Sequence, residues 1–531
     1  MSVLPSFAKP TTATQARTVV QNLFLVDSKP LKATFGQTVK GVSTYYGPNT
    51  KPLYYIVKLS PTGFVVVSAD DTIEPIIALV QRGDYNPSTS NTLGALVSRD
   101  MKVRMAIATS ISDTHARSLS LKFAGQAENA QKRWAFLLAT PAQRSMNRSV
   151  YASALGSLSD VRVAPLVQTE WSQATTDDYP NSPLCYNYYT PNNYVCGCVA
   201  TAMAQLMYFH KYPTTGVDAT QPFSITVDNT TRGELLLGGD GNGGPYNWNL
   251  MPLVPSATPT LIPEAQRQAI GALCHDAGTA AHMDYESDGS GAYMGDASSA
   301  LKSVFHYTNA VLGSAYPNNI DVPNMIDSNL DAGYPVLLGI SGDGGHAIVC
   351  DGYGYESSTL YHHLNMGWSG YDNAWYNLPD IQTTSYNFNV VDECIYNTFP
   401  QGSGEIISGR VVNRAGNPVA GATVTAATSN GQTVESVTTN ANGIYALVQL
   451  ADSTAYTISA AKTGMQSGPP RLVQTGLSQD NSYACGNMWG IDFSLYSPND
   501  LMITTNSLPD GEVGSSYNVT LQADGGTAPY T

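Results

Sequence analysis

The sequence predicts an α+β protein that continues into all-β domains, and three features of the chain carry this prediction. Residues 198–210 place Val, Met and Leu side chains at helical spacing. Residues 336–364 instead hold short apolar runs separated by glycine turns, which is typical of strands. From residue 404 onward, short strands alternate with Gly, Pro and Asn turns, the pattern of a small antiparallel sandwich.

The first 150 residues form a basic-rich region of mixed character. Residues 54–59 and 63–68 predict a hairpin, because two apolar runs flank a short Ser-Pro-Thr turn. A helix is expected around residues 127–138. Residues 140–162 lose all periodicity, so we expect an exposed linker before a second domain at 163–400. A second helix of that domain is expected near 264–277.

Composition favours an extracellular protein. The 531 residues suffice for three or four domains, and only 13% are charged, while the chain contains 32 tyrosines and 47 glycines. No apolar stretch approaches the roughly 18 residues of a membrane span. No hydrophobic signal segment follows Met1, so we expect the leader to be missing from this sequence. The net charge of −15 gives no support for nucleic-acid binding.

The charge is distributed unevenly along the chain. Residues 1–150 hold 17 Lys and Arg against 8 Asp and Glu, whereas residues 151–400 hold 5 against 24 and residues 401–531 hold 4 against 9. Opposite charges would help the first region to dock on the second. The alternative is that each domain carries only its own solubility charge.

Cys198 is the first candidate for chemistry. It stands at the first turn of the predicted helix 198–210, where the helix dipole and unpaired N–H groups favour the thiolate. This position makes a nucleophile. The alternative is a small buried cysteine that packs like alanine.

Two downstream residues favour the nucleophile. His346 begins a predicted strand 148 residues after Cys198, within the roughly 130–150 residues typical of papain-like peptidases, and Asn365 follows it. An imidazole can take the thiol proton and later protonate the leaving amine. Asn365 would orient the imidazole ring.

Gln173 lies 25 residues before Cys198, where papain-like enzymes place an oxyanion-hole glutamine. Its amide and the backbone N–H of Cys198 would stabilise the charge that develops on the carbonyl oxygen. Taken alone, Gln173 reads as a surface residue. The ordered set with Cys198, His346 and Asn365 favours catalysis.

The remaining cysteines predict bridges and no metal site. Seven cysteines fit one free thiol plus up to three disulfides, with a connectivity that spacing does not give. Cys196 and Cys198 are too close for a zinc pair, and no paired histidines follow at ligand distance. We expect no cofactor.

The chain resembles a known family, the streptopain-type bacterial cysteine peptidases of the papain-like clan. The resemblance covers about residues 50–400 and rests on many short blocks in the family's order. These blocks are residues 63–70, 197–202, 210–213, 246–249, 283–285, 345–347 and 365–368.

The resemblance implies a papain-like two-lobed catalytic domain at 163–400. It also implies an inhibitory prodomain at 1–150 with a processing linker to about residue 162. The implied roles are nucleophile for Cys198, general base for His346, oxyanion donor for Gln173 and support of the histidine for Asn365. Trp368 is retained and would shield that last contact, whereas Met366 replaces a tryptophan of the streptococcal type.

The C-terminal part resembles accessory modules. Residues 404–496 are similar to a carboxypeptidase-regulatory-like domain, which has no catalytic residues of its own. Residues 500–531 look like the start of a truncated bacterial Ig-like domain, because 32 residues cannot close a sandwich of about 100.

Two functions of different classes remain. The first is a secreted or cell-surface cysteine endopeptidase, made as an autoinhibited zymogen, that hydrolyses proteins or peptides through a Cys-His thiolate–imidazolium pair. The second is a surface-binding or adhesin-like protein with an inactive papain-like domain. The intact set Cys198, His346, Gln173 and Asn365 favours the first.

Overall fold

The structure is a computed structural model that divides into two compact units. Unit 1 comprises residues 1–403 together with 478–485, and unit 2 comprises residues 404–477 and 486–531. The described residues are 9–47, 50–110, 120–146, 159–177, 182–257, 262–315, 320–340, 345–378, 390–497, 502–503, 520 and 523–524. The short stretch 478–485 interrupts the sequence of unit 2, so the predicted domain 404–496 is not continuous in the fold.

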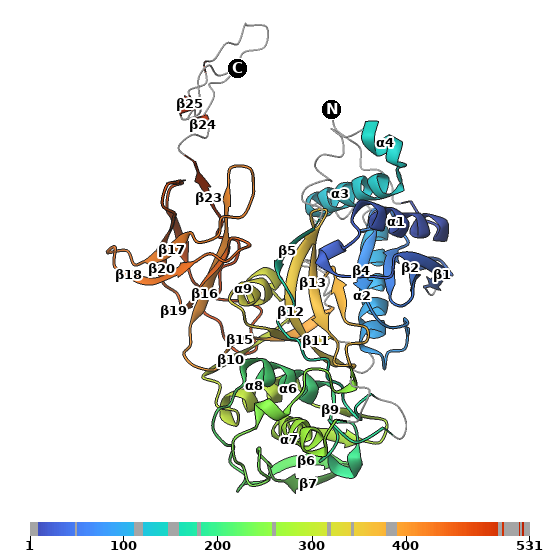
Figure 1. The fold of residues 1–531 in the computed structure, drawn as a ribbon, viewed down its shortest axis with the longest axis vertical. Helices are drawn as coiled ribbons and strands as arrows, with labels where there is room; N and C mark the ends of the chain where they lie inside the picture. Colours follow the sequence, from blue (N-terminus) through green and yellow to red (C-terminus); the bar gives the residue numbers. More distant parts are fainter. Residues whose placement is uncertain are drawn as a thin grey trace. The chain divides into compact units, whose positions relative to one another are not determined.

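The N-terminal part of unit 1 is a four-stranded antiparallel meander with helices (Figure 1). The predicted hairpin is confirmed, with Lys58 of one strand opposite Phe64 of the next. The predicted helix 127–138 is confirmed as the second half of α3. The elements are α1 (Ala13–Val26), η1 (Pro30–Lys32), β1 (Thr38–Tyr46), β2 (Pro52–Ser60), β3 (Phe64–Ser68), β4 (Ile76–Val80), α2 (Thr92–Ser110), α3 (Ser120–Leu138) and α4 (Pro141–Met146).

This meander continues directly into the sheet that carries His346. Strand β4 pairs with β14, so that Ala78 lies opposite Tyr376. The resulting order is β1-β2-β3-β4-β14-β13-β12-β11-β15-β10, with β5 added beside β12. The added strands are β5 (Ser159–Val163), β10 (Asn309–Ser314), β11 (Val336–Ile340), β12 (His346–Glu356), β13 (Thr359–Asn365), β14 (Ala374–Tyr376) and β15 (Val391–Phe399).

One apolar core joins the two halves of this sheet. Tyr361 and Trp375, both 2% exposed, lie in the same cluster as Trp134 of α3 and Tyr55 of β2. Because this cluster draws on both sides of the β4–β14 seam, the hydrophobic effect holds the N-terminal part on the rest of unit 1.

The remainder of unit 1 contains helices and a small sheet of order β7-β6-β8-β9, and it carries Cys198 at the start of α6. Helix α6 packs against α7 and against β12, which brings the helical half onto the sheet half (Figure 1). The expected helix 264–277 is confirmed as α7. The elements are η2 (Pro191–Asn193), α6 (Cys198–His210), β6 (Phe223–Val227), β7 (Thr230–Glu234), η3 (Trp248–Leu250), η4 (Pro255–Ala257), α7 (Glu264–Ala280), β8 (Asp284–Glu286), β9 (Gly289–Gly291), α8 (Met294–Ser303), η5 (Pro323–Asp327) and α9 (Ser328–Asp331).

Unit 2 contains the predicted sandwich, built from two four-stranded sheets with the orders β19-β16-β23-β21 and β18-β17-β20-β22. Its strands are β16 (Glu405–Asn413), β17 (Thr423–Ala427), β18 (Thr433–Thr438), β19 (Ile444–Leu450), β20 (Ala455–Ala461), β21 (Gln466–Ser467), β22 (Arg471–Gln474) and β23 (Phe493–Tyr496). Of the expected Ig-like segment 500–531, most lies outside the described residues. Only the pair β24 (Met502–Ile503) and β25 (Ala523–Asp524) and residue 520 are described.

Two expectations are corrected. Residues 140–162 were expected to form a linker without periodic structure, but they include the helix α4 (Pro141–Met146) and most of β5, in which Val163 pairs with Tyr353 of β12. All seven cysteines lie among the described residues and none forms a disulfide. The count allowed bridges but said nothing of where the sulfurs lie. Six of the seven are buried as free thiols, and four of them, Cys185, Cys196, Cys198 and Cys274, share one core cluster. Within the described ranges, no helix is long and apolar enough to cross a membrane.

The shared core gives a first prediction. In a Cys198→Ala background, Trp375→Ala should lower the free energy of unfolding of unit 1 by about 3–5 kcal/mol, because it leaves a cavity at the seam. Urea unfolding followed by circular dichroism measures this. Leu472→Ala is the control, since that side chain is 79% exposed in unit 2. Equal midpoints for the two variants would contradict a core shared across the seam.

Candidate active site

Helix α6 begins at Cys198 because Gly197 permits a sharp turn before it. Gly197 has φ 90°, and a Cβ there would lie 2.9 Å from both the Met283 side chain and the Ser290 carbonyl oxygen. Only glycine fits both constraints. The turn presents Cys198, 8% exposed, at the first position of the helix, as the sequence predicts.

The sulfur of Cys198 lies among backbone donors in a buried place. Burial raises the pKa of the Cys198 thiol, and hydrogen bonds from the N–H groups of Ala347, Val199 and Cys198 itself only partly oppose this. In this arrangement the thiol is therefore protonated at neutral pH. The contact with Ala347 also shows that the start of β12 meets the start of α6.

His346 is the first residue of β12, where it pairs with Ile340 at the end of β11. Its Nε2 lies 3.1 Å from the backbone oxygen of Thr89 in the N-terminal part. A carbonyl oxygen only accepts hydrogen bonds, so Nε2 carries a proton and donates it. Burial lowers the pKa of His346, while the contact with Thr89 raises it. The imidazole is thus bonded to the N-terminal part.

The turn that carries Thr89 is anchored on both sides. Asn91 caps α2 by accepting from the N–H of Gly94 at 2.8 Å, and its amide donates to Asp372 at 3.0 Å. The indole N–H of Trp368 donates to the hydroxyl of Thr92 at 2.9 Å. Trp368 was expected to shield a contact between Asn365 and His346. In the described contacts it binds Thr92, at the start of the helix that follows Thr89.

Gln173 is brought to the start of α6 by its backbone. Its carbonyl accepts the N–H of Cys196 at 2.8 Å, two residues before the nucleophile. The hydroxyl of Thr201 in α6 donates to the Ser172 carbonyl at 3.0 Å. Gln173 is only 6% exposed, which excludes the alternative of an ordinary surface residue.

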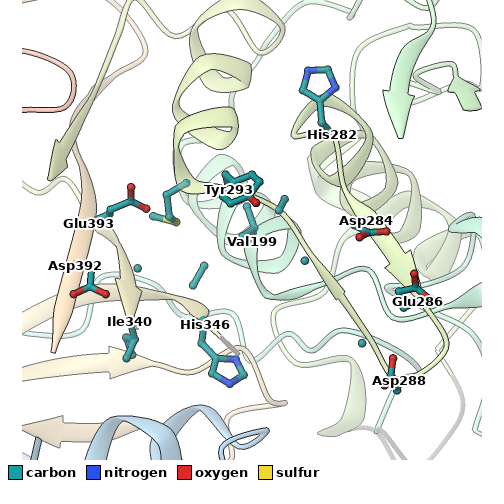
Figure 2. A pocket seen from close by; sticks show the side chains of 17 residues that line it. Val199, His282, Asp284, Glu286, Asp288, Tyr293, Ile340, His346, Asp392 and Glu393 are labelled. Carbon is teal, nitrogen blue, oxygen red and sulfur yellow. The ribbon is translucent and has the colours of Figure 1, made fainter. Parts of the chain in front are cut away.

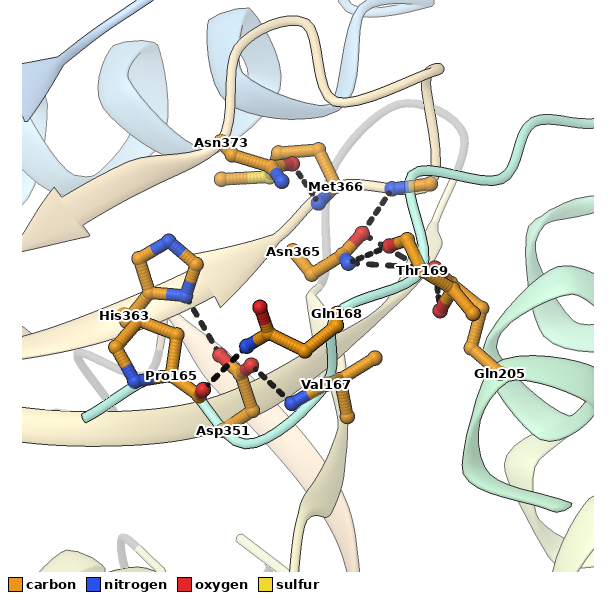
Figure 3. A network of polar contacts seen from close by, with 11 residues as sticks. Pro165, Val167, Gln168, Thr169, Gln205, Asp351, His363, Asn365, Met366 and Asn373 are labelled. Carbon is orange, nitrogen blue, oxygen red and sulfur yellow. Dashed lines mark hydrogen bonds and ion pairs between the residues drawn. The ribbon is translucent and has the colours of Figure 1, made fainter. Parts of the chain in front are cut away.

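Asn365 has different partners from those expected (Figure 3). Its amide donates to the Thr169 carbonyl at 2.8 Å and pairs with the Gln205 amide, and its oxygen accepts the N–H of Gly367 at 3.1 Å. In the described contacts it holds Thr169 rather than His346. Asn365 lies opposite Val349 in the sheet, three residues beyond His346. The sequence order Cys198, His346, Asn365 could not reveal that Asn365 binds Thr169.

A second anchor of the same segment escaped the sequence analysis (Figure 3). Asp351 accepts the N–H of Val167 at 2.8 Å through one oxygen and contacts His363 Nδ1 at 2.6 Å through the other. Both side chains are buried. Together with Asn365, they fix the segment that leads to Gln173. Alternation along a strand predicts that His362 and His363 point to opposite faces of the sheet. The sequence around His363 does not indicate that it contacts Asp351.

A cleft of about 580 Å³ opens beside the nucleophile. Val199, His346 and Ala347 lie on it, and Figure 2 shows His346 at one end. The β8–β9 hairpin forms one wall and the ends of β11 and β15 form the other. A polypeptide could therefore lie between the helical half and the sheet half, with a carbonyl next to Cys198.

Three family models match this chain. Residues 180–376 match the Peptidase C10 family, residues 8–100 match the Spi protease inhibitor, and residues 406–483 match the carboxypeptidase regulatory-like domain. The first match contains Cys198, His346, Asn365 and Trp368, the second contains Thr89, and Gln173 precedes the first.

Curated relatives agree with the first match. Streptopain of Streptococcus pyogenes is 30% identical over 193 residues, which are 36% of this chain and 47% of the relative. The thiol protease/hemagglutinin PrtT of Porphyromonas gingivalis is 31% identical over 182 residues, 34% of this chain and 20% of the relative. Residues 180–376, which match the Peptidase C10 family, are called the C10 domain. The chain spans about half the length of streptopain.

Solved structures also align with the C10 domain and its surroundings. A prointerpain A fragment of Prevotella intermedia aligns with a TM-score of 0.43 and 20% identity, over 67% of this chain and 98% of that one. Active interpain A of the same organism aligns with a TM-score of 0.35 and 25% identity, over 44% and 94%. The assignment of the C10 domain rests on the sequence matches.

The contacts of Asn365 generate a prediction. Asn365→Ala should lower the free energy of unfolding by about 1–3 kcal/mol, because it leaves the buried Thr169 carbonyl and the Gln205 amide without their partner. Urea unfolding measures this, again in a Cys198→Ala background. Gln168→Ala is the control, since Gln168 lies in the same segment but is exposed. An Asn365→Ala chain as stable as this control would show that Asn365 does not anchor the segment.

Proposed function

We propose that this protein is a cysteine endopeptidase made as an autoinhibited zymogen. The observation that supports it most is the convergence of Cys198, the start of β12 and Gln173 at one end of α6, where Cys198 and β12 lie within the C10 match and Gln173 just before it. The N-terminal part carries both the inhibitor match and the carbonyl that binds His346.

In the proposed reaction, His346 accepts the Cys198 proton and the thiolate attacks the peptide carbonyl. The oxyanion receives hydrogen bonds from the N–H of Cys198 and the amide of Gln173, each such donor contributing about 10²–10³ in rate. The imidazolium then protonates the leaving amine. Water hydrolyses the thioester, with His346 acting as the base.

The intact chain opposes the first of these steps, the proton transfer from Cys198 to His346. The Thr89 carbonyl accepts a hydrogen bond from His346, and burial keeps the Cys198 thiol protonated. Removing the N-terminal part would free the imidazole ring of His346 from this contact. We place the processing cut between α4 and β5, since α4 has no buried residue and β5 belongs to the central sheet. Secretion or display at the cell surface fits the composition and is part of the proposal.

The proposal has a direct test. The 56.5 kDa chain should shorten from its N-terminus and digest casein, whereas Cys198→Ala, purified from the same host, should do neither. Gel electrophoresis and N-terminal sequencing of the products measure both. Cys485→Ala is the matched control, because that cysteine is the least buried of the seven and lies outside the C10 match.

The alternative of an inactive, surface-binding protein gives the opposite outcome. In that case Cys198→Ala and the wild-type chain would process equally, and neither would digest casein or react with an epoxide inhibitor of cysteine peptidases. Such a result would remove Cys198 from any catalytic role.

A further inference from the structure

The cleft beside Cys198 carries carboxylates on both of its walls (Figure 2). Asp284, Glu286 and Asp288 come from the β8–β9 hairpin, and Asp392 and Glu393 come from β15. No Lys or Arg occurs among the described residues that line it. Five carboxylates thus line the place where a substrate would lie.

Between the walls the surface is largely apolar. Val199, Ile340, Met294 and Ala347 line the cleft between the two acidic sets. Lys and Arg side chains pair a long aliphatic stem with a charged end, and they bury the stem against apolar surface while the end reaches polar groups. A cleft with an apolar floor and an acidic rim therefore fits a Lys or Arg side chain better than it fits an apolar side chain.

Asp392 and Glu393 of β15 are partly buried next to each other, and among the described residues only Asp392 has a cation beside it. Burial raises the pKa of Glu393, and the neighbouring charge of Asp392 raises it further. Burial likewise raises the pKa of Asp392, against which the charge of Arg99 acts. A further cation in the cleft would relieve the repulsion between these two groups.

The chain itself already places a cation on this rim. A guanidinium nitrogen of Arg99, on α2 of the N-terminal part, lies 3.4 Å from Asp392 Oδ1. Both side chains are about one-third exposed, at 34% and 37%. When the N-terminal part leaves, Asp392 loses this partner. This contact is independent of the cleft's composition and shows which kind of side chain the rim accepts.

We propose that the cleft selects protein substrates with a Lys or Arg side chain close to the scissile bond, held by the carboxylates of the β8–β9 hairpin and β15. In the full-length chain Arg99 occupies one of these positions. This inference rests on the proposed peptidase function and names its substrate class.

Quenched fluorescent peptides test the selection with the processed enzyme. One peptide series carries a single Lys at each position on either side of the cut, and matched series carry norleucine or Glu there. At the favoured position, kcat/KM for Lys should exceed that for norleucine about tenfold, with Glu lower still. The ratio should shrink as salt rises, because the rim is open to solvent.

Variants locate the effect. The chains D284N/E286Q/D288N and D392N/E393Q should each lower the ratio of Lys to norleucine, and their combination should bring it near one. D218N/D240N is the control, because both carboxylates are exposed in the same domain, lie outside the cleft and accept N–H bonds that asparagine can still accept. It should leave the ratio unchanged. The ratio of kcat/KM for Lys to that for norleucine does not depend on the fraction of active enzyme, because both values come from the same preparation.

The outcomes separate the two proposals. Equal kcat/KM for Lys and norleucine at every position in the wild-type enzyme overturns the selection, as does a preference that survives in the combined variant. Casein digestion that depends on Cys198 would still uphold the peptidase in either case. If a variant does not fold, the wild-type ratio and its salt dependence still decide.

Discussion

The pairing of β4 with β14 is the interaction on which the rest of unit 1 depends. Strand β14 has only three residues and is bonded to β13 on one side and β4 on the other. This pairing extends the catalytic sheet into the N-terminal part, and the core around Trp375 and Tyr361 seals the seam. Cutting the linker alone would leave both in place, so processing must be followed by separation of the two parts. The product would then have a short edge strand, which limits unwanted pairing with other chains.

Because strand pairing and a buried core attach the N-terminal part, charge has a secondary role in holding it in place. The opposite net charges of residues 1–150 and 151–400 predicted an electrostatic docking. The structure has ion pairs across the seam, such as Arg82 with Glu170, but their side chains are 38% and 34% exposed. Such pairs contribute little to stability. Strand pairing and the buried core hold the complex, while charge would assist its formation and, at Arg99, mark the acidic rim of the cleft.

Much of the candidate site could be predicted from sequence because its signals are local. The helix at Cys198 and the strand that begins at His346 follow from short-range periodicity. Other features are contacts between distant segments. The β4–β14 seam, the strand β5 and the bond between Asn365 and Thr169 leave no local pattern. The contact of Thr89 with His346 could not be predicted for a further reason. Thr89 binds through its backbone carbonyl, which every residue has.

In the proposed zymogen, the N-terminal part suppresses the thiolate by binding His346, while the buried Cys198 thiol stays protonated. The most direct test is the rate at which iodoacetamide alkylates Cys198, followed by peptide mapping across a range of pH. It compares the processed enzyme with a chain whose mapped cut site has been replaced. In the intact chain, the raised pKa of Cys198 predicts slow alkylation at neutral pH that accelerates only under alkaline conditions. In the processed enzyme, alkylation should already be fast at mildly acidic pH. The same pH dependence in both forms would contradict the account.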